Sequence, residues 1–175
     1  ASVADGSDLE SVLRARRSGG GKSLVPYLTG GLFAGGDGDW TDVLRAVAAA
    51  GADGIEVGIP FSDPVMDGPV IQEASELALR AGTTPPEILD GLSRVDAGVP
   101  LAVMTYVNLV YRFGYERFAA TAAASGVSAV ILPDVPLEES ADWCAAADAA
   151  GVQTVMLAAP TGSDERLARV VARAH

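Results

Sequence analysis

Residues 54–72 read GIEVGIPFSDPVMDGPVIQ, and this stretch decides how the rest of the chain is interpreted. It opens as a short apolar strand that carries one charge, Glu56. Successive side chains of a strand point to opposite faces, so Ile55 and Val57 share one face and Glu56 points to the other. Burial at such a position raises the pKa of a carboxyl group, which suits a general acid or base. A structural ion pair between Glu56 and a buried arginine is the other interpretation.

The loop predicted after this strand, residues 60–72, contains three prolines and the carboxylates Asp63 and Asp67. Prolines restrict the backbone of a loop, which is typical of loops that present side chains to a ligand. Each aspartate also fits an Asx-turn, and Asp67-Gly68 is a common turn pair. A magnesium site on the two aspartates has no evident third oxygen ligand nearby, so we expect no metal.

Apolar strands alternate with alanine-rich helices along the whole chain. Strands are predicted at residues 24–28, 54–57, 101–106, 129–132 and 154–157, and helices at 8–17, 41–50, 85–95, 115–124, 137–150 and 164–174. Short strands rich in Val, Ile and Leu are typical of parallel sheets covered on both faces. The spacing predicts an α/β protein built of right-handed βαβ units. The pattern alone leaves open a doubly wound sheet and a (β/α)8 barrel.

Composition excludes several classes of function. The chain has 175 residues, with 12 basic and 23 acidic side chains and a net charge of −11, which argues against a nucleic-acid partner. An apolar fraction of 49% is enough for one domain, residues 1–175, with a sizeable core. We expect no membrane span and no signal peptide, because no sufficiently long apolar run occurs. Cys144 is the only cysteine, which favours a reducing, cytoplasmic location.

Histidine and lysine are nearly absent, which narrows the chemistry further. His175 is the only histidine, so we expect neither a Ser-His-Asp or Cys-His site nor a zinc site of imidazoles and thiolates. Lys22 is the only lysine and follows three glycines, a poor position for a pyridoxal phosphate anchor. The same segment fails as a P-loop, because Arg16 stands where the first glycine is required. Carboxylates and tyrosines therefore remain as candidate catalytic groups.

The stretch from Glu56 to Gln72 closely resembles the signature of the tryptophan synthase alpha chain family, roughly [LV]-E-[LV]-G-[IV]-P-F-S-D-P-x-x-D-G-P-x-I-Q. Residues 24–29 (LVPYLT), 104–108 (MTYVN) and 131–139 (ILPDVPLEE) resemble the family too. The resemblance implies a (β/α)8 TIM barrel, of which this chain supplies the leading helix and the first five βα units. Family members continue for about another third of their length, and barrels of this kind hold phosphate after strands seven and eight.

The resemblance implies a lyase of tryptophan biosynthesis that cleaves indole-3-glycerol phosphate to indole and glyceraldehyde 3-phosphate without a cofactor of its own. It implies that Glu56 is the catalytic acid and base, and that Asp67 accepts a hydrogen bond from the indole N–H and stabilises the cationic indolenine. Positions that resemble the family's substrate pocket are Tyr27, Met104, Tyr106, Ile131 and Asp134. Ordinary core packing at strand ends is the alternative for Tyr27, Met104, Tyr106 and Ile131, and the two interpretations are hardest to distinguish for Met104 and Ile131.

The resemblance also implies a partner, the tryptophan synthase beta chain, in an alpha2-beta2 heterotetramer. In the family the beta chain carries pyridoxal phosphate and receives indole through a tunnel. Pro60, Asp63 and Asn108 match positions that face it. Two other functions stay open at this point. One is a stand-alone indole-glycerol-phosphate lyase that releases free indole, and the other is an inactive partial barrel that only binds and stimulates a beta chain.

Overall fold

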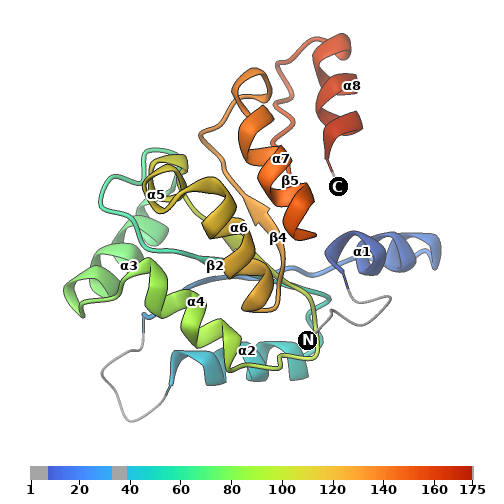
Figure 1. Cartoon of the computed structure of the whole chain (residues 1–175). Helices are drawn as coiled ribbons and strands as arrows, with labels where there is room; N and C mark the ends of the chain where they lie inside the picture. Colours follow the sequence, from blue (N-terminus) through green and yellow to red (C-terminus); the bar gives the residue numbers. More distant parts are fainter. Residues whose placement is uncertain (1–7, 33–38, 175) are drawn as a thin grey trace.

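The computed structural model describes residues 8–32 and 39–174. Within them, five parallel strands form one sheet in the order β1-β2-β3-β4-β5 (Figure 1). The strands are β1 Tyr27–Thr29, β2 Ile55–Gly58, β3 Leu101–Met104, β4 Val127–Ile131 and β5 Gln153–Val155. Strands that pair in chain order are the arrangement of consecutive βα units in a (β/α)8 barrel, whereas a doubly wound sheet reverses its order partway. The barrel prediction is confirmed for the first five units.

The helices agree with the predicted ones except in three places. They are α1 Leu9–Ser18, α2 Trp40–Ala49, α3 Pro69–Arg80, α4 Pro85–Ser93, α5 Val107–Phe113, α6 Tyr115–Ala124, α7 Ala141–Ala150 and α8 Asp164–Arg173, with a short 3-10 helix η1 Leu137–Glu139.

The sequence predicts neither α3 nor α5. Pro69 opens α3, because proline's missing N–H is no loss at the first helical position. The helix predicted at 137–150 is divided at Ser140, whose hydroxyl donates to the Leu137 carbonyl (2.8 Å). None of the described helices is long and apolar enough to span a membrane.

The start of β1 also differs from the prediction. The carbonyl of Pro26 already accepts a hydrogen bond from the Glu56 N–H (2.9 Å). Proline has no N–H to return the bond, so the regular ladder begins at Tyr27 instead of residue 24.

The strand register aligns inner-face side chains in two rows across the sheet. One row contains Tyr27, Glu56, Ala102, Ala129 and Gln153, and the next, toward the carboxyl ends of the strands, contains Thr29, Gly58, Met104, Ile131 and Val155. Because the side-chain period of a strand is two, both rows share one face of the sheet. This inner face corresponds to the lumen of a barrel.

The opposite face carries the main hydrophobic core. Ile55, Val57 and Val103 are fully buried there against helix residues that include Leu44 of α2 and Phe118 of α6. Complete burial of such a side chain stabilises the fold by about 1.5–3 kcal/mol. The helices thus fix the sheet from outside and leave the inner face to other contacts.

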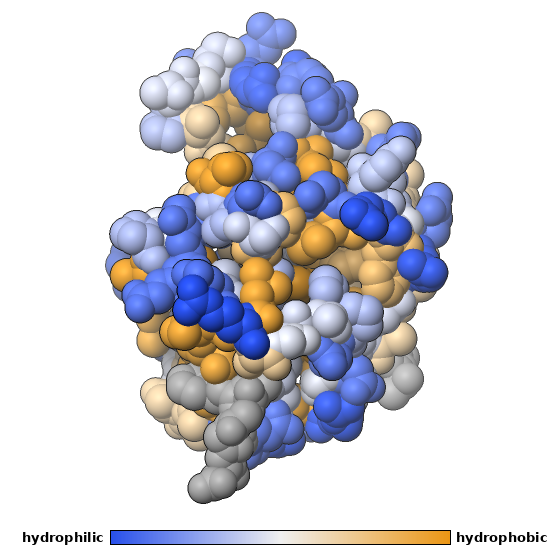
Figure 2. Space-filling model, turned by 90° about the vertical axis from the view of Figure 1, so that its left-hand side faces the viewer, coloured by the Kyte–Doolittle hydropathy of each residue, from blue (hydrophilic) through white to orange (hydrophobic). Residues whose placement is uncertain are grey.

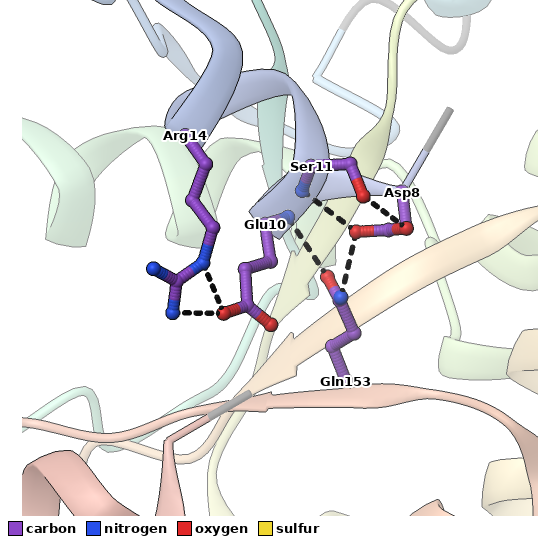
Figure 3. A network of polar contacts seen from close by, with 5 residues as sticks. All are labelled: Asp8, Glu10, Ser11, Arg14 and Gln153. Atoms are coloured by element: carbon purple, nitrogen blue, oxygen red, sulfur yellow. Dashed lines mark hydrogen bonds and ion pairs between the residues drawn. The ribbon is translucent and has the colours of Figure 1, made fainter. Parts of the chain in front are cut away.

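Helix α1 closes the N-terminal end of this inner face. Leu9 is buried against Ala102 and Ala129. Asp8 caps the helix by accepting the Ser11 N–H (2.8 Å). Gln153, the first residue of β5, donates to the same Asp8 oxygen (2.8 Å) and accepts the backbone N–H at the start of α1 (3.1 Å; Figure 3). The network attaches the first helix to the last described strand.

Candidate active site

Glu56 lies on the inner face of β2, as its place in the sequence predicts. Its neighbours Ile55 and Val57 are fully buried on the helix-covered face, while Glu56 is half-buried. Burial raises the pKa of Glu56 above its ordinary value, and the negative charge of Asp67 raises it further. Within the described residues none of the ion pairs involves Glu56, so the structural ion pair with a buried arginine is not formed there. The arrangement favours a carboxyl group that exchanges protons.

Asp67 is held in place by its backbone and its side chain together. Its N–H donates to the Pro64 carbonyl (3.1 Å), which closes a turn in the loop after β2, residues 59–68. Its carbonyl accepts a hydrogen bond from the Gln72 side chain (2.8 Å), and its Oδ2 accepts one from the Tyr106 hydroxyl (3.0 Å). Its carboxylate therefore has a defined position close enough to Glu56 to affect the proton affinity there.

Tyr106 connects the loops that follow β2 and β3. It is buried at the N-cap of α5, and its ring lies against Phe61 with centroids 5.0 Å apart. Its hydroxyl donates to Asp67 and accepts the Met66 N–H (3.0 Å). Burial raises the pKa of Tyr106, and the Asp67 carboxylate raises it further. The phenol therefore stays protonated and remains a donor to Asp67.

Tyr27 crosses the inner face directly above Gly58. A Cβ atom at position 58 would lie 1.9 Å from the Tyr27 hydroxyl, so only glycine accommodates the ring in this place. The Thr29 hydroxyl donates to the Tyr27 oxygen (3.5 Å). Burial raises the pKa of Tyr27, and the nearby charges of Asp67 and Glu56 raise it further. Tyr27 is thus near enough to both carboxylates for their charges to affect its pKa.

The other predicted pocket residues divide into two groups. Met104 is buried and Ile131 half-buried, and both belong to the second inner-face row, at the carboxyl ends of β3 and β4. Asp134 lies beyond β4, where both of its carboxylate oxygens accept the Val107 N–H (3.0 and 3.2 Å). Met104 and Ile131 therefore share a face with Glu56, whereas the carboxylate of Asp134 is bound to backbone.

The three residues predicted to face a partner differ in exposure. Asp63 and Asn108 are exposed, and Asp63 Oδ2 accepts a hydrogen bond from the Ser62 hydroxyl (2.6 Å). Pro60 is buried, so within this chain it shapes the loop instead of presenting a surface. Next to Asp63, Val65 is 79% exposed and Met66 58%. Figure 2 shows that the side of the molecule bearing α3 and α5 exposes apolar surface among hydrophilic side chains.

Sequence reasoning missed three contributors to the site. Gln72 is within the quoted stretch, but its bond to the Asp67 carbonyl requires the unpredicted start of α3. Gly58 carries the signal of a glycine inside a strand, which often marks a close approach. Val107 acts through its backbone N–H, for which no side-chain pattern exists. Within the described residues, no three His, Cys, Asp or Glu side chains gather as a metal site would require.

A carboxyl group of raised pKa, with an oriented carboxylate near it, is suited to general acid–base chemistry. Known proteins resemble this chain along most of its length. The family model described as tryptophan synthase alpha chain matches residues 13–175. A tryptophan synthase alpha chain of Thermobifida fusca is 50% identical over 131 residues, covering 74% of this chain and 48% of the relative. That of Carboxydothermus hydrogenoformans is 39% identical over 173 residues, covering 96% and 63%.

Solved structures give the same result. Tryptophan synthase from M. tuberculosis superimposes with a TM-score of 0.87 at 36% identity, covering 97% of this chain and 68% of that one. The tryptophan synthase complex from Pyrococcus furiosus superimposes with a TM-score of 0.78 at 38% identity, covering 87% and 62%. The chain thus spans between about half and just under two thirds of the length of the two curated relatives.

Proposed function

Because this chain belongs to the tryptophan synthase alpha chain family, we propose that it contributes the catalytic carboxylates for cleaving indole-3-glycerol phosphate to indole and glyceraldehyde 3-phosphate. The observation that carries the proposal is the electrostatic influence of the loop carboxylate Asp67 on Glu56 of the inner face. Glu56 has a raised pKa there, and Asp67 is oriented beside it by the Tyr106 hydroxyl. We also propose a cytoplasmic location, because a single cysteine favours a reducing compartment.

Glu56 supplies the proton transfers in the proposed reaction. Its protonated form donates to the ring carbon that bears the glycerol chain, which makes the indole a cationic indolenine. The carboxylate left behind then takes the proton of the adjacent hydroxyl group. That oxygen becomes the carbonyl of glyceraldehyde 3-phosphate as the carbon–carbon bond breaks, and the bonding electrons return to the ring. A carboxyl group whose pKa is raised by burial is suited to both directions of transfer.

Asp67 stabilises the charge that develops on the ring. Its carboxylate accepts a hydrogen bond from the indole N–H, and the bond strengthens as the ring becomes cationic. Preorganisation matters here, because a carboxylate already oriented by Tyr106 does not reorganise during the reaction. Tyr27, Met104 and Ile131 supply the apolar surface for the ring. No cofactor enters this step.

The second part of the proposal is a beta chain that docks on the loop after β2 and on α5 and that carries the pyridoxal phosphate. Exposed Asp63, Val65 and Asn108 lie in these two segments. Exposed apolar side chains beside polar ones are typical of protein–protein contact sites. A solved relative from Pyrococcus furiosus is a tryptophan synthase complex, which supports this assignment.

The test is indole release from indole-3-glycerol phosphate, measured for the wild-type chain and for Glu56→Gln, with and without beta chain. Glutamine keeps the shape and the hydrogen bonds of Glu56 but cannot shuttle a proton, so release is expected to fall by at least about 100-fold. Glu73→Gln, at an exposed position of α3, is the matched control and is expected to retain wild-type release. Release above a tenth of wild type in Glu56→Gln, or no release by wild type even with beta chain, would contradict the proposal.

A further inference from the structure

The carboxylate of Asp134 binds the backbone at the start of α5, which its position in the sequence does not predict. It follows β4, and both of its carboxylate oxygens accept the single N–H of Val107 (3.0 and 3.2 Å). Val107 is the first residue of α5, and the N-cap residue Tyr106 provides no side-chain cap of its own. The first N–H groups of a helix have no partner within the helix, and the start of a helix attracts negative charge. Asp134 therefore caps α5 from the neighbouring loop.

Tyr106, the residue before the capped Val107, contacts the loop after β2. Tyr106 directly precedes Val107, so the position of the first turn of α5 determines where its hydroxyl lies. That hydroxyl donates to Asp67 Oδ2 and accepts the Met66 N–H, both at 3.0 Å. Asp134, in the loop after β4, is thus hydrogen-bonded to Val107. Val107 is covalently joined to Tyr106, and Tyr106 is hydrogen-bonded to the loop after β2. Phe61 packs against the Tyr106 ring and adds an apolar contact to the same junction.

We propose that Asp134 is a positioning residue for Asp67, acting through Val107 and Tyr106, instead of a residue that binds substrate. Its carboxylate is already bound to a backbone N–H, and the chain of contacts ends on the carboxylate assigned to the ring N–H. The catalytic consequence rests on the proposed function, whereas the linkage rests only on these hydrogen bonds. Displacements of about 1 Å in a catalytic group reduce rates by up to about 100-fold, so a remote cap has a measurable effect.

Residue-resolved amide hydrogen exchange of the whole chain tests the linkage without any activity. In Asp134→Ala, both the Val107 and the Met66 amides are expected to exchange about tenfold faster. In Tyr106→Phe, the Met66 amide is expected to accelerate while the Val107 amide stays protected, because the series is cut after Val107. An unchanged Met66 amide in Asp134→Ala, beside an accelerated Val107 amide, would overturn the proposal. If Asp134→Ala does not fold, Asp134→Asn decides, because a neutral amide oxygen holds the Val107 N–H more weakly than the carboxylate does. Both amides are then expected to exchange faster by a smaller factor, and a Met66 amide that stays unchanged while the Val107 amide accelerates would overturn the proposal.

Kinetics of indole release test the consequence. Asp134→Ala is expected to lower kcat about tenfold and to leave KM within about twofold, because a displaced Asp67 weakens transition-state stabilisation more than binding. Asp134→Asn keeps an oxygen acceptor for the Val107 N–H and is expected to recover most of the loss. Glu139→Ala, an exposed carboxylate in η1, is the control and is expected to change neither constant. A rise in KM at unchanged kcat would identify Asp134 as a substrate ligand and overturn the proposal.

The two tests separate this proposal from the proposed function. Coupled exchange at Val107 and Met66 without any indole release would leave the linkage standing and refute the lyase assignment. If indole release depends on Glu56 but the exchange rate of the Met66 amide is unchanged in Asp134→Ala, only the positioning role would be refuted.

Discussion

Asp8, at the N-cap of α1, and Glu56, on β2, are two carboxyl groups whose pKa values are shifted in opposite directions. Asp8, at the N-terminal end, accepts the Ser11 N–H, the Ser11 hydroxyl and the Gln153 amide, and the Ser11 bonds are the main cause of its lowered pKa. Glu56, on the inner face, has a pKa raised by burial and by Asp67. Hydrogen bonds satisfy one carboxylate and stabilise the fold, whereas the other is left ready to take up a proton. In TIM barrels, residues at the N-terminal face serve mainly stability, whereas catalytic residues come from the carboxyl-terminal ends of the strands and the loops that follow.

The largest effect that we expect separates the two aspartates of the loop after β2. Asp67→Asn retains an oxygen for the Tyr106 hydroxyl but loses the charge, so indole release is expected to fall by about 100-fold with a smaller change in KM. Asp63→Asn, at an exposed position, is expected to spare the isolated reaction and to weaken activation by beta chain. Steady-state kinetics of both variants, with and without beta chain, measure this. Equal loss of the isolated reaction in both would remove the distinction between a catalytic and an interface carboxylate.

The next effect concerns the contact of Tyr27 with Gly58 on the inner face. Gly58→Ala places a Cβ atom on the Tyr27 hydroxyl, and displacing the ring is expected to cost about 1–3 kcal/mol in the free energy of unfolding. Urea denaturation measures the cost. In a Tyr27→Ala background the same substitution is expected to be nearly neutral, because the obstructing ring is gone. A full cost in both backgrounds would show that the two residues are not coupled.

A smaller effect is expected at the N-terminal end. Asp8→Ala removes the cap of α1 and is expected to cost about 1 kcal/mol at neutral pH. Because the folded state lowers the pKa of Asp8, its contribution is complete above the unfolded value of about 3.9 and is lost as the pH falls through the folded value. Denaturation at several pH values measures this trend. Glu10→Ala breaks only an exposed pair with Arg14 and is the control, with an expected cost below about 0.5 kcal/mol.

The smallest effect has the opposite sign. A raised folded pKa means that the native state holds the Glu56 proton more tightly than the unfolded state does. The contribution of Glu56 to stability therefore declines as the pH rises from about 4.3, the unfolded value, through the folded one. Glu56→Gln is expected to be more stable than wild type at neutral pH and equal to it in acid, in contrast to Asp8→Ala. Loss of stability in Glu56→Gln at neutral pH would assign Glu56 a structural role.

Much of this molecule follows from sequence, for identifiable reasons. Strand β2 and the inner-face position of Glu56 follow from the alternation of apolar and acidic residues, which tertiary packing does not override here. The sequence does not predict helix α3, because proline marks loops but also occupies the first position of helices, as Pro69 does here. Two contacts of the site join residues from different strands or loops: the packing of Tyr27 over Gly58, and the cap that Asp134 provides for Val107. They arise from the register of the sheet, so no local sequence pattern predicts them.

Carboxyl-carbon NMR titration of Glu56 tests the central claim most directly, because it measures proton affinity without requiring turnover. The account predicts that Glu56 titrates above the ordinary glutamate value of about 4.3 and that Asp67→Asn lowers its pKa toward that value. Asp8, observed in the same spectra, is predicted to titrate below the ordinary aspartate value of about 3.9. A Glu56 that titrates at or below 4.3, about the value of an unperturbed glutamate, would contradict the account.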